Sequence, residues 1–132
     1  MNPTKILALA LLLATPALAD ETWMAAEGDV TYLADVGSTA VLGFTLDGHP
    51  ARLYVPGLAG NADHRGVHDA YWIAQGATTT CDAGMGAPDG FTSQSWGRAT
   101  VVFDVPTFPT GFTALLGDCL ADPARPLRAD LR

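Results

Sequence analysis

The fold is decided by a stretch that reads AVLGFTLDGHPARLYV over residues 40–55. The segments 40–46 and 51–55 each carry apolar residues at alternate positions, which is the period of a strand with one buried face. Between them stand Asp47-Gly48-His49-Pro50. The Asp-Gly pair accommodates positive φ angles, and the proline removes a backbone donor at the start of the return strand. The stretch therefore predicts a β-hairpin.

The rest of the chain continues in the same manner. Short apolar runs alternate with Gly, Pro, Asp and Asn, and no segment sustains a helical period over ten or more residues. Further strands are expected at residues 22–26, 30–34, 70–74, 97–105 and 112–116. Six to eight short strands at this spacing predict a mostly β protein, either a compact antiparallel β-sandwich or a small β-barrel, with one disulfide. The strand pattern alone does not decide between these two architectures.

The chain contains two cysteines, Cys81 and Cys119. An even number of cysteines in an exported domain indicates a structural disulfide. Closing a loop of this length removes about 4 kcal/mol of freedom from the unfolded chain on a chain-entropy estimate. The alternative, a nucleophilic Cys81, requires an activating base and a reducing or protected setting. We therefore expect the two cysteines to be joined.

The first nineteen residues have the pattern of a signal peptide. Lys5 precedes the apolar run 6–13, and small residues at Ala17 and Ala19 come just before Asp20. The run is too short to span a bilayer, so no membrane anchor is expected after cleavage. Residues 20–120 are expected to form a single β domain, and residues 121–132 a docked or frayed C-terminal tail. The alanine-rich, nearly lysine-free composition is typical of a GC-rich bacterial genome. Together with the signal-peptide pattern, it predicts a periplasmic or secreted bacterial protein.

The charge balance excludes several partner classes. Without the leader, six arginines and fourteen acidic residues remain, and the formal charge is −8. A nucleic-acid-binding protein needs a basic stripe, which this composition cannot supply. An acidic surface is also repelled by anionic membranes. The expected partner is a protein or a glycan of the cell envelope.

One cluster has the composition of a metal site. Asp63, His64, His68 and Asp69 form the pattern Asp-His-x-x-x-His-Asp, whose two imidazoles share a face on a regular element. Zinc requires at least a third ligand, and Gly66 interrupts a helix between the histidines. A solvated polar loop explains the same residues, so no metal or other cofactor is expected, and the four side chains are retained only as candidate ligands.

The aromatic residues offer another candidate surface. Tyr71 and Trp72 lie before the glycine-rich loop that follows Cys81, and Trp96 lies after it. A cluster of the three on one face would stack on a sugar ring or anchor a protein partner. Core packing is the competing explanation for the same residues. We select these three as the candidate binding surface.

No catalytic constellation is recognised in the sequence. Ser93 and Ser95 lack the Gly-x-Ser-x-Gly context of a nucleophile elbow, and no catalytic residue is assigned. The first hypothesis is a non-enzymatic exported binding or inhibitor-type module. The alternatives are a small metal-dependent or acid/base hydrolase, and a structural envelope component whose interface is the arginine-bearing tail.

Overall fold

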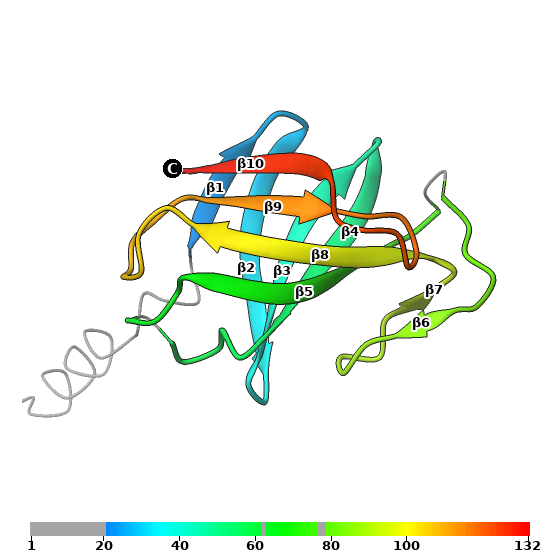
Figure 1. Cartoon of the computed structure of the whole chain (residues 1–132), viewed down its shortest axis with the longest axis horizontal. Helices are drawn as coiled ribbons and strands as arrows, with labels where there is room; N and C mark the ends of the chain where they lie inside the picture. Colours follow the sequence, from blue (N-terminus) through cyan, green and yellow to red (C-terminus); the bar gives the residue numbers. More distant parts are fainter. Residues whose placement is uncertain (1–20, 62, 77–78) are drawn as a thin grey trace, which may run out of the picture.

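Eight antiparallel strands close into a barrel in the computed structural model, which describes residues 21–61, 63–76 and 79–132 (Figure 1). The order around the barrel is β1-β10-β9-β8-β5-β4-β3-β2, and β6 and β7 pair with each other outside it. In chain order the strands are β1 (Thr22–Ala25), β2 (Gly28–Val36), β3 (Thr39–Leu46), β4 (His49–Pro56), β5 (Val67–Ala74), β6 (Met85–Gly86), β7 (Thr92–Ser93), β8 (Ser95–Phe103), β9 (Phe112–Leu116) and β10 (Arg125–Leu131). The expected β fold is confirmed, as a barrel. The predicted signal peptide lies outside the described residues.

The predicted hairpin is confirmed as β3 and β4. Leu46 pairs with His49, so Asp47 and Gly48 alone form the turn. Their φ angles are 51° and 81°, as a type I′ turn requires. Leu42 and Leu53 lie opposite each other and are fully buried. The alternating pattern therefore directs one face of the hairpin to the barrel interior.

The interior of the barrel is a packed apolar core. Its largest fully buried side chains include Trp23, Trp72 and Phe112. Trp23 meets Phe112 edge to face, with ring centroids 5.1 Å apart, and its indole N–H donates to the Thr110 carbonyl at 2.8 Å. An eight-stranded barrel is just wide enough to be filled by such side chains. The barrel interior is therefore occupied by the side chains of the core.

The connections between strands gather at two ends. The end called here the disulfide end carries the β1–β2 and β3–β4 turns, the β5–β8 connection with β6 and β7, and the β9–β10 connection (Figure 1). The opposite end, called the ion-pair end, carries the β2–β3, β4–β5 and β8–β9 connections. The disulfide lies at the first end, and a buried ion pair lies at the second.

A buried ion pair closes the ion-pair end. Arg65 donates to both carboxylate oxygens of Glu21 at 2.9 and 2.7 Å, and both side chains are almost fully buried. The guanidinium carbon lies 5.3 Å from the ring centre of Phe103 and 5.1 Å from that of Phe108. Bidentate pairing between aromatic faces compensates part of the cost of burying both charges. This pair joins chain segments that are 44 residues apart.

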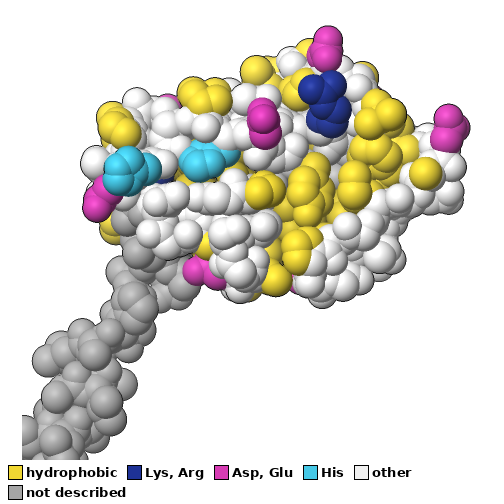
Figure 2. Space-filling model, turned by 60° about the horizontal axis from the view of Figure 1, so that its bottom comes forward, with side chains coloured by type: hydrophobic (Ala, Val, Ile, Leu, Met, Phe, Trp, Pro, Cys, Tyr) yellow, Lys and Arg dark blue, Asp and Glu magenta, His cyan; other side chains and the backbone are white. Residues whose placement is uncertain are grey.

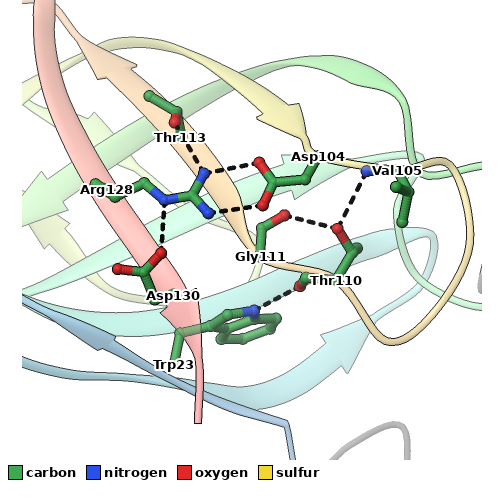
Figure 3. A network of polar contacts seen from close by, with 8 residues as sticks. All are labelled: Trp23, Asp104, Val105, Thr110, Gly111, Thr113, Arg128 and Asp130. Carbon is green, nitrogen blue, oxygen red and sulfur yellow. Dashed lines mark hydrogen bonds and ion pairs between the residues drawn. The ribbon is translucent and has the colours of Figure 1, made fainter.

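The prediction of a C-terminal tail is wrong for residues 125–131, which form β10 and complete the barrel between β9 and β1. Arg128 on this strand donates to Asp104 at 2.7 and 2.6 Å and to Asp130 at 2.9 Å (Figure 3). The β10 arginines pair with acidic residues of the turns and loops around the barrel, at Glu27, Asp47 and Asp104. Residues 125–131 are therefore not the arginine-bearing tail on which the hypothesis of a structural envelope component relied. Pro126 lies where β1 does not pair with β10, and proline is tolerated at such an unpaired edge.

Candidate functional site

The candidate metal ligands are not brought together. Asp63 and His64 are exposed in the loop before β5, whereas His68 lies on β5, with its ring perpendicular to that of Phe103. Asp69 follows on the same strand and is exposed, and adjacent residues of a strand point to opposite faces. Within residues 21–61, 63–76 and 79–132, no group of three His, Cys, Asp or Glu side chains is placed to hold a metal ion.

The candidate aromatic platform does not form as one exposed surface. Trp72 is 1% exposed and belongs to the barrel interior, whereas Tyr71 and Trp96 lie in a second cluster outside the barrel. Tyr71 and Trp72 are neighbours on one strand, so they cannot share a face. Trp96 is 8% exposed and donates from its indole nitrogen to the Ala83 carbonyl at 2.7 Å. Only Tyr71 is partly open to solvent.

These outer aromatics instead support the connection between β5 and β8. Residues 79–94, called here the β6–β7 loop, fold back on the outer cluster through Cys81, Met85 and Phe91. Figure 2 shows hydrophobic side chains gathered in a band on this side of the molecule, with two histidines at the opposite end. The loop is therefore packed against the barrel.

Asp89 joins the β6–β7 loop to β4. Its carboxylate accepts hydrogen bonds from the Tyr54 hydroxyl at 3.0 Å and from Arg52 at 2.8 Å. Burial and the Asp89 carboxylate raise the pKa of Tyr54 well above its usual 10.0. Burial would raise the pKa of Asp89, but hydrogen bonds from the Phe91 N–H, Tyr54 and Arg52 outweigh it and lower that pKa. The phenol therefore stays protonated and the carboxylate ionised over the ordinary pH range.

The predicted disulfide is confirmed between Cys81 and Cys119, whose Cα atoms are 5.6 Å apart. It joins the β6–β7 loop to the β9–β10 connection, so the two loops form one unit at the disulfide end. A disulfide is compatible with an extracellular or periplasmic location. The described part of the chain includes no helix long and apolar enough to cross a membrane.

The second loop of this unit is a tight turn over residues 117–122, called here the Leu120 turn. The Ala121 N–H closes it on the Asp118 carbonyl at 2.9 Å, and Cys119 adopts a φ of 55°, which is uncommon for a residue with a side chain. The Cys119 N–H donates to the Trp96 carbonyl at 2.9 Å. These hydrogen bonds and the disulfide connect the turn to β8 and to the β6–β7 loop.

A glycine contact and a tryptophan bond fix the base of the Leu120 turn. A Cβ atom on Gly97 would lie 1.7 Å from the Gly117 carbonyl oxygen, so only glycine permits this approach of β8 to the turn. The same carbonyl accepts the indole N–H of Trp72 at 2.8 Å. The barrel core therefore contacts the turn directly.

Leu120 is the most exposed large hydrophobic side chain among the described residues, at 75%. Exposed aspartates flank it in the turn, at Asp118 and Asp122. Arg98 donates to the Leu120 carbonyl and to the Asp122 carboxylate, both at 3.2 Å. The turn therefore presents an apolar side chain to solvent between two exposed carboxylates of the chain.

Sequence reasoning missed this turn. The available signal was a leucine between a cysteine and Ala-Asp-Pro, in a stretch otherwise typical of turns. Its exposure depends on contacts with Gly97 and Trp96, some twenty residues earlier in the chain, which the local sequence does not report.

A separate hollow of about 560 Å³ lies beside the seam between β1 and β10. The two strands pair only through Trp23 with Leu131 and Met24 with Asp130, so the first half of β10 has no partner on that side. Its lining includes the buried Leu46 and Leu116 and the exposed Arg125 and Glu27. Its charged lining residues already pair with one another or with neighbours, as Arg125 does with Asp47 at 2.7 Å.

The fold and its loops define a small disulfide-bonded β-barrel with a filled interior and an exposed, rigid loop unit at one end. No protein-family model, curated protein or solved structure matches this chain.

Proposed function

We propose that the protein is an exported, non-enzymatic binding module of the bacterial cell envelope that contacts a protein partner through the Leu120 turn. The location is supported by the leader-like pattern of residues 1–19 and by a disulfide that suits an oxidising compartment. The binding role is supported by one observation above all. Leu120 is 75% exposed on a turn fixed by a disulfide and by hydrogen bonds on both sides.

An exposed leucine forgoes roughly 1.5–3 kcal/mol that its burial would contribute. Binding by a flexible loop loses conformational entropy, whereas a loop already held in one conformation loses much less. A leucine on a fixed turn is therefore suited to enter an apolar pocket of a partner at small entropic cost.

The proposal is tested by site-specific photocrosslinking in the producing bacterium. A benzophenone amino acid replaces the exposed Ala121 in the full chain, so that Leu120 itself is kept, and in a matched control it replaces Val67, which is 67% exposed at the ion-pair end. After irradiation of intact cells, we expect a discrete protein adduct from position 121 that is lost in Leu120→Ser, and none from position 67. No adduct at position 121, an adduct that persists in Leu120→Ser, or the same adducts from both positions would reject the proposed binding surface.

A further inference from the structure

The seam between β1 and β10 is incomplete at the disulfide end of the barrel. The pairing of the two strands ends at Met24 and Asp130, and β1 itself ends at Ala25, where the chain turns into β2. β10 begins earlier, at Arg125, and its other side pairs with β9 throughout this stretch. Among the described strands, none lies against the first half of β10 on the β1 side. Residues 125–128, called here the open edge, are therefore paired on one side only.

The register shows which backbone groups face outward from the open edge. The Arg132 N–H donates to the Thr22 carbonyl at 3.2 Å, and alternate residues of an antiparallel strand direct their N–H and C=O groups to the same neighbour. The groups on the β1 side are therefore those of Arg128 and Pro126. Because proline has no N–H, the edge presents the N–H and C=O of Arg128 and the C=O of Pro126. In the part of the chain that the structure describes, no strand pairs with these groups and no loop backbone bonds to them.

The hollow of about 560 Å³ lies beside this edge and reaches the core. Its lining includes Leu46 and Leu116, which are buried in the core, and Leu127, which is half-buried against it. Pro126 and Arg128 are exposed, because successive residues of a strand point to opposite faces. A strand placed along the edge would therefore direct one side chain into the hollow and its neighbours to solvent.

We propose that the open edge of β10 binds an extended peptide segment of another protein by strand addition. The backbone of the segment accepts the Arg128 N–H and donates to the carbonyls of Arg128 and Pro126. Its residue beside Leu127 is apolar and enters the hollow, and the residues on either side are polar. Main-chain hydrogen bonds supply affinity in this mode of recognition, and alternate side chains supply selectivity. The inference goes beyond the proposed function, because the Leu120 turn takes no part in it.

The size and the charges of the site favour a peptide over other occupants. The open edge extends over about 13 Å, whereas a stable interface between two folded proteins buries about 1,200–2,000 Å², so the edge is short for pairing with a second copy of this chain. An anionic amphiphile would need a free cation. Both arginines of the lining are already paired, Arg125 with Asp47 and Arg128 with Asp104. Unpaired backbone groups spaced along a strand are instead complementary to another extended backbone.

The experiment removes one backbone donor from the open edge. Arg128→Pro deletes the N–H at this position, and the matched control Arg128→Ala keeps it. Both variants lose the ion pairs of the Arg128 side chain, so a difference between them reports the N–H. Proline is tolerated where a strand N–H has no ladder partner, and thermal unfolding checks that both variants fold.

The probe is a library of short, terminally blocked peptides with one apolar residue between polar, uncharged residues. Binding to the oxidised protein is measured by affinity selection, and the Kd of each selected peptide is measured by calorimetry. Each selected peptide is also made in two N-methylated forms, which carry the methyl groups on one or the other set of alternate residues. One set removes the donors that face the edge, and the other removes those that face away, while both keep every side chain.

We expect selected peptides to bind the wild type and Arg128→Ala within about twofold of each other, and Arg128→Pro roughly three- to tenfold more weakly, the effect of one hydrogen bond. One N-methylated form should lose binding and the other should keep it. If Arg128→Pro does not fold, this difference between the two forms on the wild type decides the matter.

Several results would overturn the proposal. They are a library without a binder, equal binding to Arg128→Pro and Arg128→Ala, and equal binding of the two N-methylated forms. Binding that is lost in Leu120→Ser would move the peptide to the Leu120 turn. A dimer that the peptides do not dissociate, or decanoate that displaces them, would assign the edge to a second copy of this chain or to an amphiphile. None of these results bears on whether the Leu120 turn has a partner, because the crosslink from position 121 tests that separately.

Discussion

The indole N–H of Trp72, inside the barrel, donates a 2.8 Å hydrogen bond to the carbonyl of Gly117, the first residue of the Leu120 turn. Both groups are buried, so the bond joins the core of the barrel to the surface proposed for binding. The rigidity of that surface therefore depends on a residue that no partner can reach.

Replacing Trp72 with phenylalanine tests this connection. The variant leaves the Gly117 carbonyl without its buried donor and opens space in the core, so we expect a loss of about 2–4 kcal/mol in the free energy of unfolding. Urea denaturation measures the loss. Hydrogen exchange should also show faster exchange of the Cys119 amide, because the base of the turn is loosened.

The matched control is Trp23→Phe, which removes an equivalent bond from an indole to the Thr110 carbonyl at the opposite end. It should cost similar stability but leave the exchange of Cys119 unchanged once global unfolding is subtracted. If both variants affect Cys119 equally, the connection between Trp72 and the turn is not specific.

The buried pair between Glu21 and Arg65 gives the next prediction. Glu21→Ala leaves a buried guanidinium without its counter-ion, and removing one partner of such a pair typically costs about 3–5 kcal/mol. Glu21→Leu/Arg65→Met replaces both charges with apolar groups, so we expect it to be far more stable than the single variant. Thermal and urea unfolding measure both.

An exposed pair provides the comparison for this prediction. Asp104 and Arg128 each have side chains 44% exposed, so Asp104→Ala should cost no more than about 1 kcal/mol. A Glu21→Ala variant that loses as little as Asp104→Ala would show that the buried pair contributes nothing beyond a surface pair.

The sequence predicted the β3–β4 hairpin because the signals were local: an alternating pattern on both sides and an Asp-Gly turn between them. It did not predict β10, because Pro126 and the charged residues around it resemble a tail until their partners on other strands are known. The prediction of a shared platform for Tyr71 and Trp72 was wrong for a reason the sequence already contained, since neighbours on a strand face opposite sides.

The contacts that the sequence did not predict join residues that lie far apart in the chain. Glu21 meets Arg65 across 44 residues, and Trp72 meets Gly117 across 45. The exposure of Leu120 likewise follows from contacts that β8 makes with the turn. No local pattern reports such contacts, whereas the cysteine pair was predictable because the chain has no other pairing to offer.

The disulfide between Cys81 and Cys119 gives a prediction about the free energy of unfolding. Cys81→Ala/Cys119→Ala removes a bridge that spans 38 residues, and the chain-entropy estimate gives a loss of about 4 kcal/mol. Denaturation of the oxidised protein, the reduced protein and the variant measures it. The reduced protein should resemble the variant, and a loss below about 1 kcal/mol in both would mean that the bridge does not constrain the unfolded chain as that estimate assumes.

The last prediction concerns pH and the contacts drawn in Figure 3. Hydrogen bonds from Arg128 lower the pKa of Asp104 below its ordinary 3.8, with partial burial opposing the shift and the positive charge adding to it. Because the folded-state pKa is depressed, the stabilisation is present above the unfolded-state value and is lost as the pH falls through the folded-state value. Asp104 therefore contributes to acid unfolding only below about pH 4.

Carboxyl-carbon NMR titration of the wild type and of Arg128→Gln measures this shift. In the variant the pKa of Asp104 should return toward 3.8, because the guanidinium that favoured its ionised form is gone. Arg98→Gln is the matched control, since Arg98 pairs with Asp122 on another part of the surface and should leave Asp104 unchanged. An Asp104 that titrates at the same pH with and without Arg128 would show that this ion pair does not persist in solution, and that β10 is held in the barrel by its other contacts, the backbone pairing with β9 and β1 among them.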